Sequence, residues 1–129
     1  MYPQTPNNDC WKINFENYGN ENLKYFQGTL GNLLPLSQSI NSSLQNDCFY
    51  DKKNPKFNDR KEKIRHGYSD GSHSEIEVSY YDDWTPDAIL KRGIDLLDFM
   101  EKRWNLKFEN RQAKKELLFL DFIDKEIDK

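Results

Sequence analysis

Residues 85–104 read TPDAILKRGIDLLDFMEKRW and form the most regular segment of the chain. Thr85 suits the N-cap of a helix, Pro86 the first helical position, and Asp87 the positive end of the helix dipole. Apolar residues recur every three or four positions, which predicts a helix over 86–104. Glycine costs about 1 kcal/mol relative to alanine inside a helix, so Gly93 predicts a close contact with another element. The predicted buried stripe is Ile89 or Leu90, Ile94, Leu97, Met100 or Glu101, and Trp104.

Weaker patterns on either side of this helix predict the other elements. Alternating apolar residues indicate strands, a three-to-four spacing indicates helices, and Asn54-Pro55 predicts a helix end. The remaining predicted elements are an irregular, aromatic-pinned loop over 3–28, a strand over 30–36, a helix over 38–52, a basic helix over 56–65, a strand over 75–81 and an amphipathic helix over 111–127.

Length and composition set broad limits on the class of protein. A chain of 129 residues is long enough for one domain with its own core. No apolar run approaches the roughly 18 residues that span a bilayer, and the first residues do not resemble a secretion signal, so we expect a cytoplasmic protein without a membrane partner. Cys10 and Cys48 form no C-x-x-C pair for zinc. A disulfide between them is one alternative, but reduced thiols are expected in the cytoplasm.

A basic segment stands out in a chain whose formal net charge is −3. Between residues 52 and 66 there are seven Lys or Arg and only two acids. One interpretation is a solvated helix face. The other is a contact with nucleic-acid phosphates. The residues predicted to make that contact are Lys52, Lys53, Lys56, Arg60 and Lys61.

An ordered series of short motifs runs along the first 105 residues. It comprises Tyr2-Pro3-Gln4, Leu30-Gly31-Asn32-Leu33-Leu34, Ile40-Asn41, Asn46-Asp47-Cys48-Phe49 and Lys52-Lys53, followed by Trp84, Ile89, Arg92-Gly93 and Trp104. This series resembles the C-terminal HNH-like nuclease domain of GmrSD-type restriction endonucleases, which are type IV and modification-dependent. The Pro-Gln step and the nine-residue spacing between the two asparagines are also similar to the HNH domain of CRISPR effector nucleases.

The resemblance implies roles for particular residues. Asn32 takes the position of the middle asparagine of the catalytic site, which braces the loop and the general base, and Asn41 takes a metal-ligand position. Arg92 belongs to the motif in the long helix. The residue types alone leave other interpretations open: Asn32 as a turn residue after Gly31, and Asn41 as a helix-start residue with local hydrogen bonds.

The resemblance also implies residues that the chain lacks. In the family, an acid and a catalytic histidine would come immediately before Met1. A complete domain would use one divalent cation, Mg²⁺ or Mn²⁺, and we expect none to be bound in this chain. Loss of the general base costs roughly 10²- to 10⁴-fold, so we expect the chain to be inactive by itself. The two histidines present, His66 and His73, are interpreted as surface residues.

The expected fold is α+β and mostly helical, with a truncated ββα-metal (HNH-like) unit packed on C-terminal helices. Residues 1–105 form the HNH-like nuclease domain, and 106–129 form a C-terminal amphipathic helix of the same domain. The function expected from the resemblance is DNA cleavage in restriction or bacterial defence, with an upstream NTP-handling domain or subunit as partner. The alternatives are a non-catalytic remnant that binds nucleic acid or protein, and a helical interaction domain that dimerises through its last helix.

Overall fold

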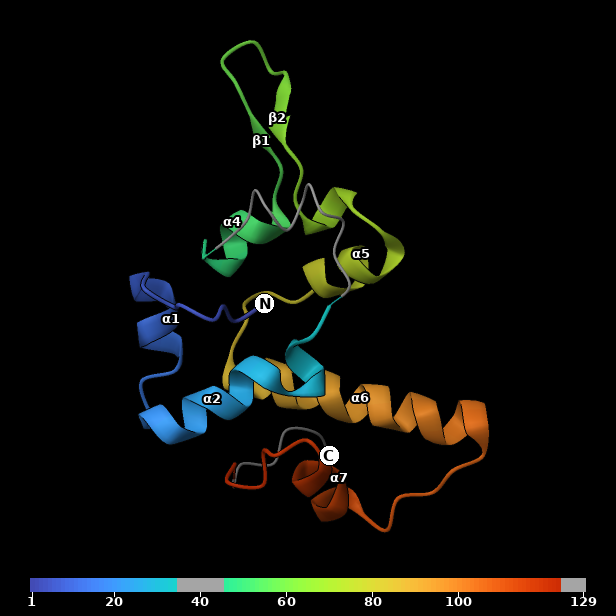
Figure 1. Ribbon diagram of the computed structural model, residues 1–129. Coiled ribbons are helices and arrows are strands. Elements are labelled where there is room, and N and C mark those ends of the chain that lie inside the picture. Colours follow the sequence, from blue (N-terminus) through green and yellow to red (C-terminus); the bar gives the residue numbers. More distant parts are fainter. Residues whose placement is uncertain (35–45, 124–129) are drawn as a thin grey trace. The chain divides into compact units, whose positions relative to one another are not determined.

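The computed structural model describes residues 1–34 and 46–123. Within them the protein is mixed α+β and mostly helical, which confirms the predicted class. None of the helices in these ranges is long and apolar enough to cross a bilayer. The elements are α1 (Asp9–Asn14), α2 (Asn20–Gly28), the 3-10 helix η1 (Leu30–Asn32), α4 (Phe49–Lys53), β1 (Lys56–Phe57), β2 (Lys63–Arg65), the 3-10 helix η2 (Tyr68–Asp70), α5 (His73–Ser79), α6 (Pro86–Trp104) and α7 (Arg111–Leu117) (Figure 1).

The chain folds into two compact units, each of which is described by itself. Unit 1 comprises Met1–Asn14 and Leu34–Trp84, and unit 2 comprises Phe15–Leu33 and Thr85–Lys129. Each unit is therefore built from segments far apart in the sequence. The predicted boundary between an HNH-like domain over 1–105 and a C-terminal helix over 106–129 was drawn from the family resemblance. It stays a prediction.

Aromatic side chains and a disulfide hold the short elements of unit 1 together. Trp84 is fully buried and stacks on Phe49 at a centroid distance of 5.4 Å. Trp11 is also buried, and its indole nitrogen donates to the Asn46 carbonyl oxygen at 3.1 Å. This contact brings α1 beside the start of α4. Cys10 and Cys48 lie at the same place and form a disulfide with Cα atoms 6.0 Å apart, so the expectation of reduced thiols was wrong.

Unit 2 is built along α6, as its sequence predicted. The Thr85 side chain accepts from the Ala88 amide at 3.1 Å and caps the helix, and Pro86 takes its first position. Most of the predicted stripe is buried, but Trp104 is 57% exposed because it lies in the last turn of the helix. The residues of α6 that form the buried face are Ala88, Ile89, Leu90, Gly93, Ile94 and Leu97.

The segment predicted as a basic helix is a β-hairpin, and in the described residues it forms the sheet of the protein. β1 and β2 pair antiparallel with a bulge. Asn58 explains the turn, because its side-chain oxygen accepts from the amides of Arg60 and Glu62, both at 2.9 Å. Lys61 takes a positive φ of 63° in the same turn. A helical reading of the charges overlooked this asparagine turn.

The segment predicted as a strand over 75–81 lies mostly in α5. Ser72 caps this helix: its side chain accepts from the Glu75 amide, and the Glu75 side chain accepts from the Ser72 amide. This reciprocal pair is a capping box, a helix-start signal that outweighs a short alternation of apolar residues. Ile76 and Val78 therefore lie on a helix rather than alternating across a sheet.

Four other predicted elements differ from the structure or lie partly outside the described residues. The expected loop over 3–28 contains α1 and α2, and the expected strand at 30–36 begins with η1. Of the expected helix over 38–52, residues 38–45 lie outside the described ranges and the helix that is described is α4. It ends at Lys53, with Asn54 as its C-cap before Pro55, which confirms the predicted helix end. Of the expected helix over 111–127, residues 124–127 lie outside the described ranges; α7 ends at Leu117, and Phe119 has a positive φ of 60°.

Candidate functional site

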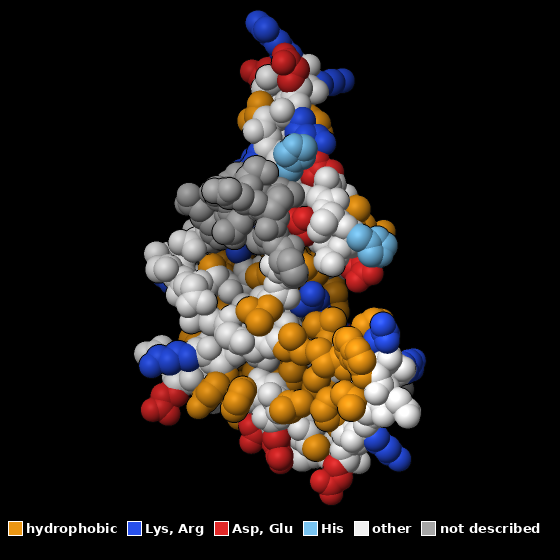
Figure 2. Space-filling view, turned by 45° about the vertical axis from the view of Figure 1, so that its right-hand side comes forward, with side chains coloured by type: hydrophobic (Ala, Val, Ile, Leu, Met, Phe, Trp, Pro, Cys, Tyr) orange, Lys and Arg blue, Asp and Glu red, His pale blue; other side chains and the backbone are white. Residues whose placement is uncertain are grey.

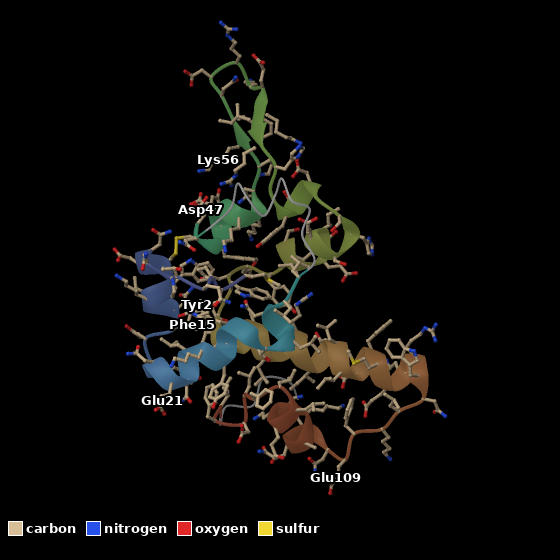
Figure 3. All side chains as sticks on the ribbon, in the orientation of Figure 1. Tyr2, Phe15, Glu21, Asp47, Lys56 and Glu109 are labelled. Atoms are coloured by element: carbon tan, nitrogen blue, oxygen red, sulfur yellow. A yellow bond between two sulfur atoms is a disulfide. The ribbon has the colours of Figure 1, made fainter. Side chains whose placement is uncertain are left out.

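The backbone of residue 1 lies inside unit 1 and is held by two side chains. Met1 and Tyr2 are buried, at 9% and 4% exposed, and Figure 3 labels Tyr2 inside the unit. The amino nitrogen of Met1 donates to Tyr68 Oη at 3.0 Å. The carbonyl oxygen of Met1 accepts from Lys52 Nζ at 2.7 Å. Side chains from α4 and η2 therefore bind both polar backbone groups of this residue.

Lys52 is a buried lysine whose ammonium is committed to this contact. It is 4% exposed, and its Nζ lies 5.3 Å from the centroid of the Trp11 ring. Burial lowers the pKa of Lys52 to about 8, and the nearby charge of Asp47 opposes the shift. A buried ammonium is costly unless it is hydrogen-bonded. The Met1 carbonyl and the Trp11 ring compensate part of that cost.

Two further ionisable groups of unit 1 are buried. Tyr68 is 1% exposed, and burial, followed by the negative charge of Glu75, raises its pKa. Glu75 is also 1% exposed. Its Oε1 accepts from the Ser72 amide at 2.8 Å, whereas its Oε2 is buried without a hydrogen-bond partner in the described part of the chain. No sequence pattern indicated Tyr68, but the Ser-x-x-Glu spacing at 72–75 could have indicated Glu75.

Asn32, the predicted catalytic asparagine, lies in unit 2 at the end of η1. It is 4% exposed, and its side-chain nitrogen donates to the Gln27 carbonyl oxygen at 3.1 Å. Its own amide donates to the Thr29 carbonyl oxygen at 3.0 Å. These bonds join the end of α2 to η1. The side chain therefore braces the local backbone, the kind of contact expected of a middle asparagine, while its part in catalysis stays a prediction.

Arg92 is brought together with the Asn32 segment by α6. Its Nη1 donates to the carbonyl oxygens of Gly31 at 2.9 Å and Leu33 at 2.7 Å, on either side of Asn32. Gly31 fits against α6 because it has no side chain: a Cβ there would lie 2.0 Å from the Ile89 carbonyl oxygen. The Leu-Gly-Asn-Leu motif and the Arg-Gly motif are thus two halves of one contact within unit 2.

Gly93 confirms the close contact predicted from its place inside the helix. A Cβ at Gly93 would lie 2.9 Å from Leu118 Cδ1. Leu118 is buried directly after α7, and its carbonyl oxygen accepts from Thr29 Oγ1 at 2.8 Å. The segment after α7 therefore packs on α6 and is joined to the end of α2 within unit 2.

The five cations predicted to contact nucleic acid fall into two groups. Lys52 is buried, and Lys53 Nζ donates to the carbonyl oxygens of Tyr81 at 3.0 Å and Asp82 at 3.4 Å. The other three are exposed on the hairpin, where Figure 3 labels Lys56 and Figure 2 shows basic side chains with acidic ones among them. These three are Lys56, Arg60 and Lys61. None of the contacts with nucleic acid is tested by the geometry, and they stay predictions.

The base of the hairpin is tied to the rest of unit 1. Arg65 Nη1 pairs with Asp47 Oδ2 at 2.8 Å, and its Nη2 donates to the carbonyl oxygens of Asp51 and, at 3.1 Å, Asn54. The strands themselves stay open to solvent, with Phe57 54% and Ile64 64% exposed. The hairpin is therefore a fixed arm that presents both cations and apolar side chains.

Both histidines are surface residues, as predicted. The side chains of His66 and His73 are 58% and 92% exposed. His66 Nδ1 lies 3.0 Å from Asp70 Oδ2, and Asp70 also accepts from Lys63 and from the Gly67 amide. Burial would raise the pKa of Asp70, but these hydrogen bonds outweigh it and lower that pKa to about 2. Asp70 thus organises the end of the hairpin.

The predicted metal ligand, Asn41, lies outside the described residues, so its position relative to Asn32 stays a prediction. Among residues 1–34 and 46–123, no three His, Cys, Asp or Glu side chains come together in a way that could hold a metal ion. The site geometry that the structure does supply is the held backbone of residue 1 in unit 1 and the braced Asn32 segment in unit 2.

The sequence also matches a family model. It is the model of the C-terminal domain of GmrSD restriction endonucleases, and the match covers residues 1–99. The chain belongs to this family. No curated protein and no solved structure matches it.

Several of the contacts described above join residues of the motifs that resemble this family. Phe49 and Lys52 belong to the motifs that follow Asn41. Lys52 binds the Met1 carbonyl oxygen, and Phe49 stacks on Trp84. Arg92 comes from the motif in the long helix and binds the carbonyls beside Asn32. The motifs that resemble GmrSD-type nucleases are therefore linked in pairs by direct contacts within each unit.

Proposed function

We propose that this chain is the DNA-cleaving domain of a modification-dependent restriction endonuclease. The coarse assignment follows from the family, whose members are restriction endonucleases. The observation that carries the finer proposal is the held backbone of residue 1. The family places the catalytic histidine directly before this residue, and a general base must be held in a defined position to act on water.

Each predicted residue has a role in this proposal. In this proposal the upstream histidine takes a proton from the attacking water, and Asn32 has the role of the family's middle asparagine, bracing its own segment of unit 2. Arg92 holds that segment on α6 through the carbonyls of Gly31 and Leu33. In the complete domain, Asn41 and the upstream acid would hold one divalent cation, Mg²⁺ or Mn²⁺, and that cation would supply stabilisation of negative charge on the phosphate oxygens. In this proposal cleavage requires both the upstream histidine and the upstream acid.

The hairpin is the surface proposed to meet DNA. Residues 56–65 carry five Lys or Arg and two acids, which gives this segment a charge of +3. Because the whole chain has a net charge of −3, the rest of it carries −6. A positive arm on a negative body favours one orientation toward a polyanion. A two-stranded ribbon also has a size that a DNA groove admits. Recognition of the DNA modification, and coupling to NTP, belong to an upstream partner domain in this proposal.

Cleavage of plasmid DNA tests the proposal. The chain preceded by Asp-His should nick supercoiled plasmid in Mg²⁺ or Mn²⁺, and the unextended chain should not. Asn41→Ala in the extended chain should abolish nicking, whereas Asn110→Ala, which removes only the cap of α7, should leave the cleavage rate within about twofold. Nicking that survives Asn41→Ala would end the assignment of that residue.

A second function is favoured by the hairpin alone: binding of nucleic acid without cleavage. Its exposed cations and apolar side chains are suited to a groove or a single strand. In a gel-shift assay the two functions differ clearly. Binding that weakens with salt, with no cleavage even after Asp-His is added, would favour the non-catalytic function.

A further inference from the structure

We propose that Lys52 and Tyr68 are positioning residues of the nuclease, because together they clamp the backbone of residue 1 and so fix the catalytic group that precedes it. The inference rests on the proposed function. It assigns to Lys52 a role different from the phosphate contact that its place in a basic segment suggested. It assigns to Tyr68 a role that no motif indicated.

In the clamp, one side chain binds each polar backbone group of residue 1. Lys52 Nζ lies 2.7 Å from the carbonyl oxygen of residue 1, and Tyr68 Oη lies 3.0 Å from its nitrogen. With a residue in front of Met1, that nitrogen becomes a peptide N–H, which is still a hydrogen-bond donor within reach of Tyr68 Oη. The inference requires that this bond is kept when residue 1 is preceded by another residue.

The two clamping side chains are themselves held firmly. Lys52 lies on α4 over the Trp11 ring, and α4 is anchored by the stack of Phe49 on Trp84. Tyr68 is 1% exposed and its ring lies 6.3 Å from that of Phe49. Their rotation is restricted by this packing. Residue 1 is therefore bound by two side chains that are themselves packed in unit 1.

A mobile lysine on a DNA-binding surface would look different. It would be exposed and would keep its ordinary pKa, because an ammonium that meets phosphate spends most of its time in water. Lys52 is 4% exposed and its donated bond is internal. To reach a phosphate it would have to break that bond and leave the Trp11 ring. The geometry thus favours a role through residue 1.

The chain offers a matched control for the loss of a buried lysine. Lys115, in unit 2, is 5% exposed, and its Nζ donates to the Ile123 carbonyl oxygen at 3.0 Å. Lys52→Met and Lys115→Met therefore remove the same kind of bond from the same degree of burial. Only the first change touches residue 1. A purely structural role would give both variants the same phenotype.

The experiment compares these variants in the chain preceded by Asp-His, below the unfolding temperature of each. Single-turnover nicking should fall about 10- to 100-fold in Lys52→Met, because small misplacements of a catalytic group are costly. The DNA concentration for half-maximal rate should change less than about twofold. Lys115→Met should keep the parental rate, and Lys52→Arg, which keeps a donor, should recover part of the loss. Equal rates in the two methionine variants, or a Lys52→Met effect confined to DNA affinity, would overturn the inference.

A second readout does not depend on cleavage. The NMR signals of the added histidine ring should shift or broaden in Lys52→Met and stay unchanged in Lys115→Met. If the extended chain cuts no DNA, the proposed function fails, and these signals still decide whether Lys52 orients the histidine: unchanged signals overturn the inference. If Lys52→Met does not fold, Tyr68→Phe removes the other half of the clamp with one atom. It should slow nicking and perturb the same signals, and unchanged behaviour would overturn the inference.

Discussion

Unit 1 joins several short segments through individual polar, aromatic and covalent links, whereas unit 2 packs its segments along one helix of 19 residues. In unit 1, Lys52 binds residue 1, Trp11 binds Asn46, and Cys10 is bonded to Cys48. In unit 2, the buried face of α6 spreads its contacts over many aliphatic side chains. Unit 1 therefore depends on a few residues, and unit 2 on a continuous surface.

This difference matters for where function can be built. Apolar packing along a helix tolerates conservative substitutions, because the stability is distributed over many similar contacts. Hydrogen bonds from buried side chains fix individual backbone atoms instead. The site proposed at residue 1 lies in unit 1, which is held together mainly by such individual bonds. The Asn32 segment of unit 2 is the local exception, since Arg92 and Gly31 fix it by specific contacts.

The largest effect is expected from the aromatic stack of unit 1. Trp84→Ala removes a fully buried indole that stacks on Phe49, and should lower the free energy of unfolding by about 3–5 kcal/mol. Trp104→Ala, in the last turn of α6, removes the same side chain from a 57% exposed position and should cost less than about 1 kcal/mol. Urea denaturation measures both. Similar losses would contradict the picture of a unit 1 that depends on single residues.

Loss of the disulfide should come next in size. The bond closes a separation of 38 residues, so the Cys10→Ser and Cys48→Ser double variant should be less stable by about 2–4 kcal/mol. Differential scanning calorimetry with and without a reductant checks this. Reduction should lower the melting temperature of the parent chain to that of the double variant. A parent chain unaffected by reductant would show that the thiols are not bonded in solution.

Gly31→Ala should disturb the close approach of η1 to α6 that helps to hold the Asn32 segment of unit 2. The added Cβ meets the Ile89 carbonyl oxygen, a backbone atom, so the expected cost is about 1–3 kcal/mol. Gly28→Ala is the control, because nothing lies within 4 Å of a Cβ there. It should change the unfolding free energy by less than about 1 kcal/mol. Equal effects at the two positions would remove the argument for a close approach of η1 to α6.

The smallest predicted effect is a pH dependence from Lys52. Burial lowers its folded-state pKa to about 8 from an ordinary 10.5, so above pH 8 the unfolded state binds more protons. The free energy of unfolding should therefore rise with pH between about 8 and 9.5. Above about pH 10 the raised pKa of Tyr68 acts in the opposite direction. Lys52→Met should lose the rise, and Lys115→Met should keep it; a rise in all three would assign it to other groups.

The parts of the fold that the sequence predicted share one property. Residues 85–104 contain a cap, a proline at the first position and several turns of apolar spacing, all favouring the same helix. Residues 56–65 and 75–81 are too short for periodicity to decide. There the structure depends on single residues, Asn58 in the turn and Ser72 at the helix start. Local side-chain-to-backbone bonds outweigh a weak pattern over such lengths.

The candidate site was predicted in outline rather than in detail. Ordered motifs identified the family and singled out Asn32 and Arg92, which the structure places in one contact region of unit 2. The burial of Lys52 could not be predicted, because a lysine in a basic segment reads as exposed. Tyr68 binds residue 1 across 67 positions of sequence. Such a long-range contact leaves no local pattern to detect.

The central claim is that the nuclease chemistry is built at the held start of unit 1. The most direct test adds Mn²⁺ to the ¹⁵N-labelled chain preceded by Asp-His and follows which amide signals broaden first. The account predicts that the added Asp-His, Asn41, residue 1 and Tyr2 broaden first. Broadening that begins elsewhere, with residue 1 and Tyr2 unaffected, would contradict it.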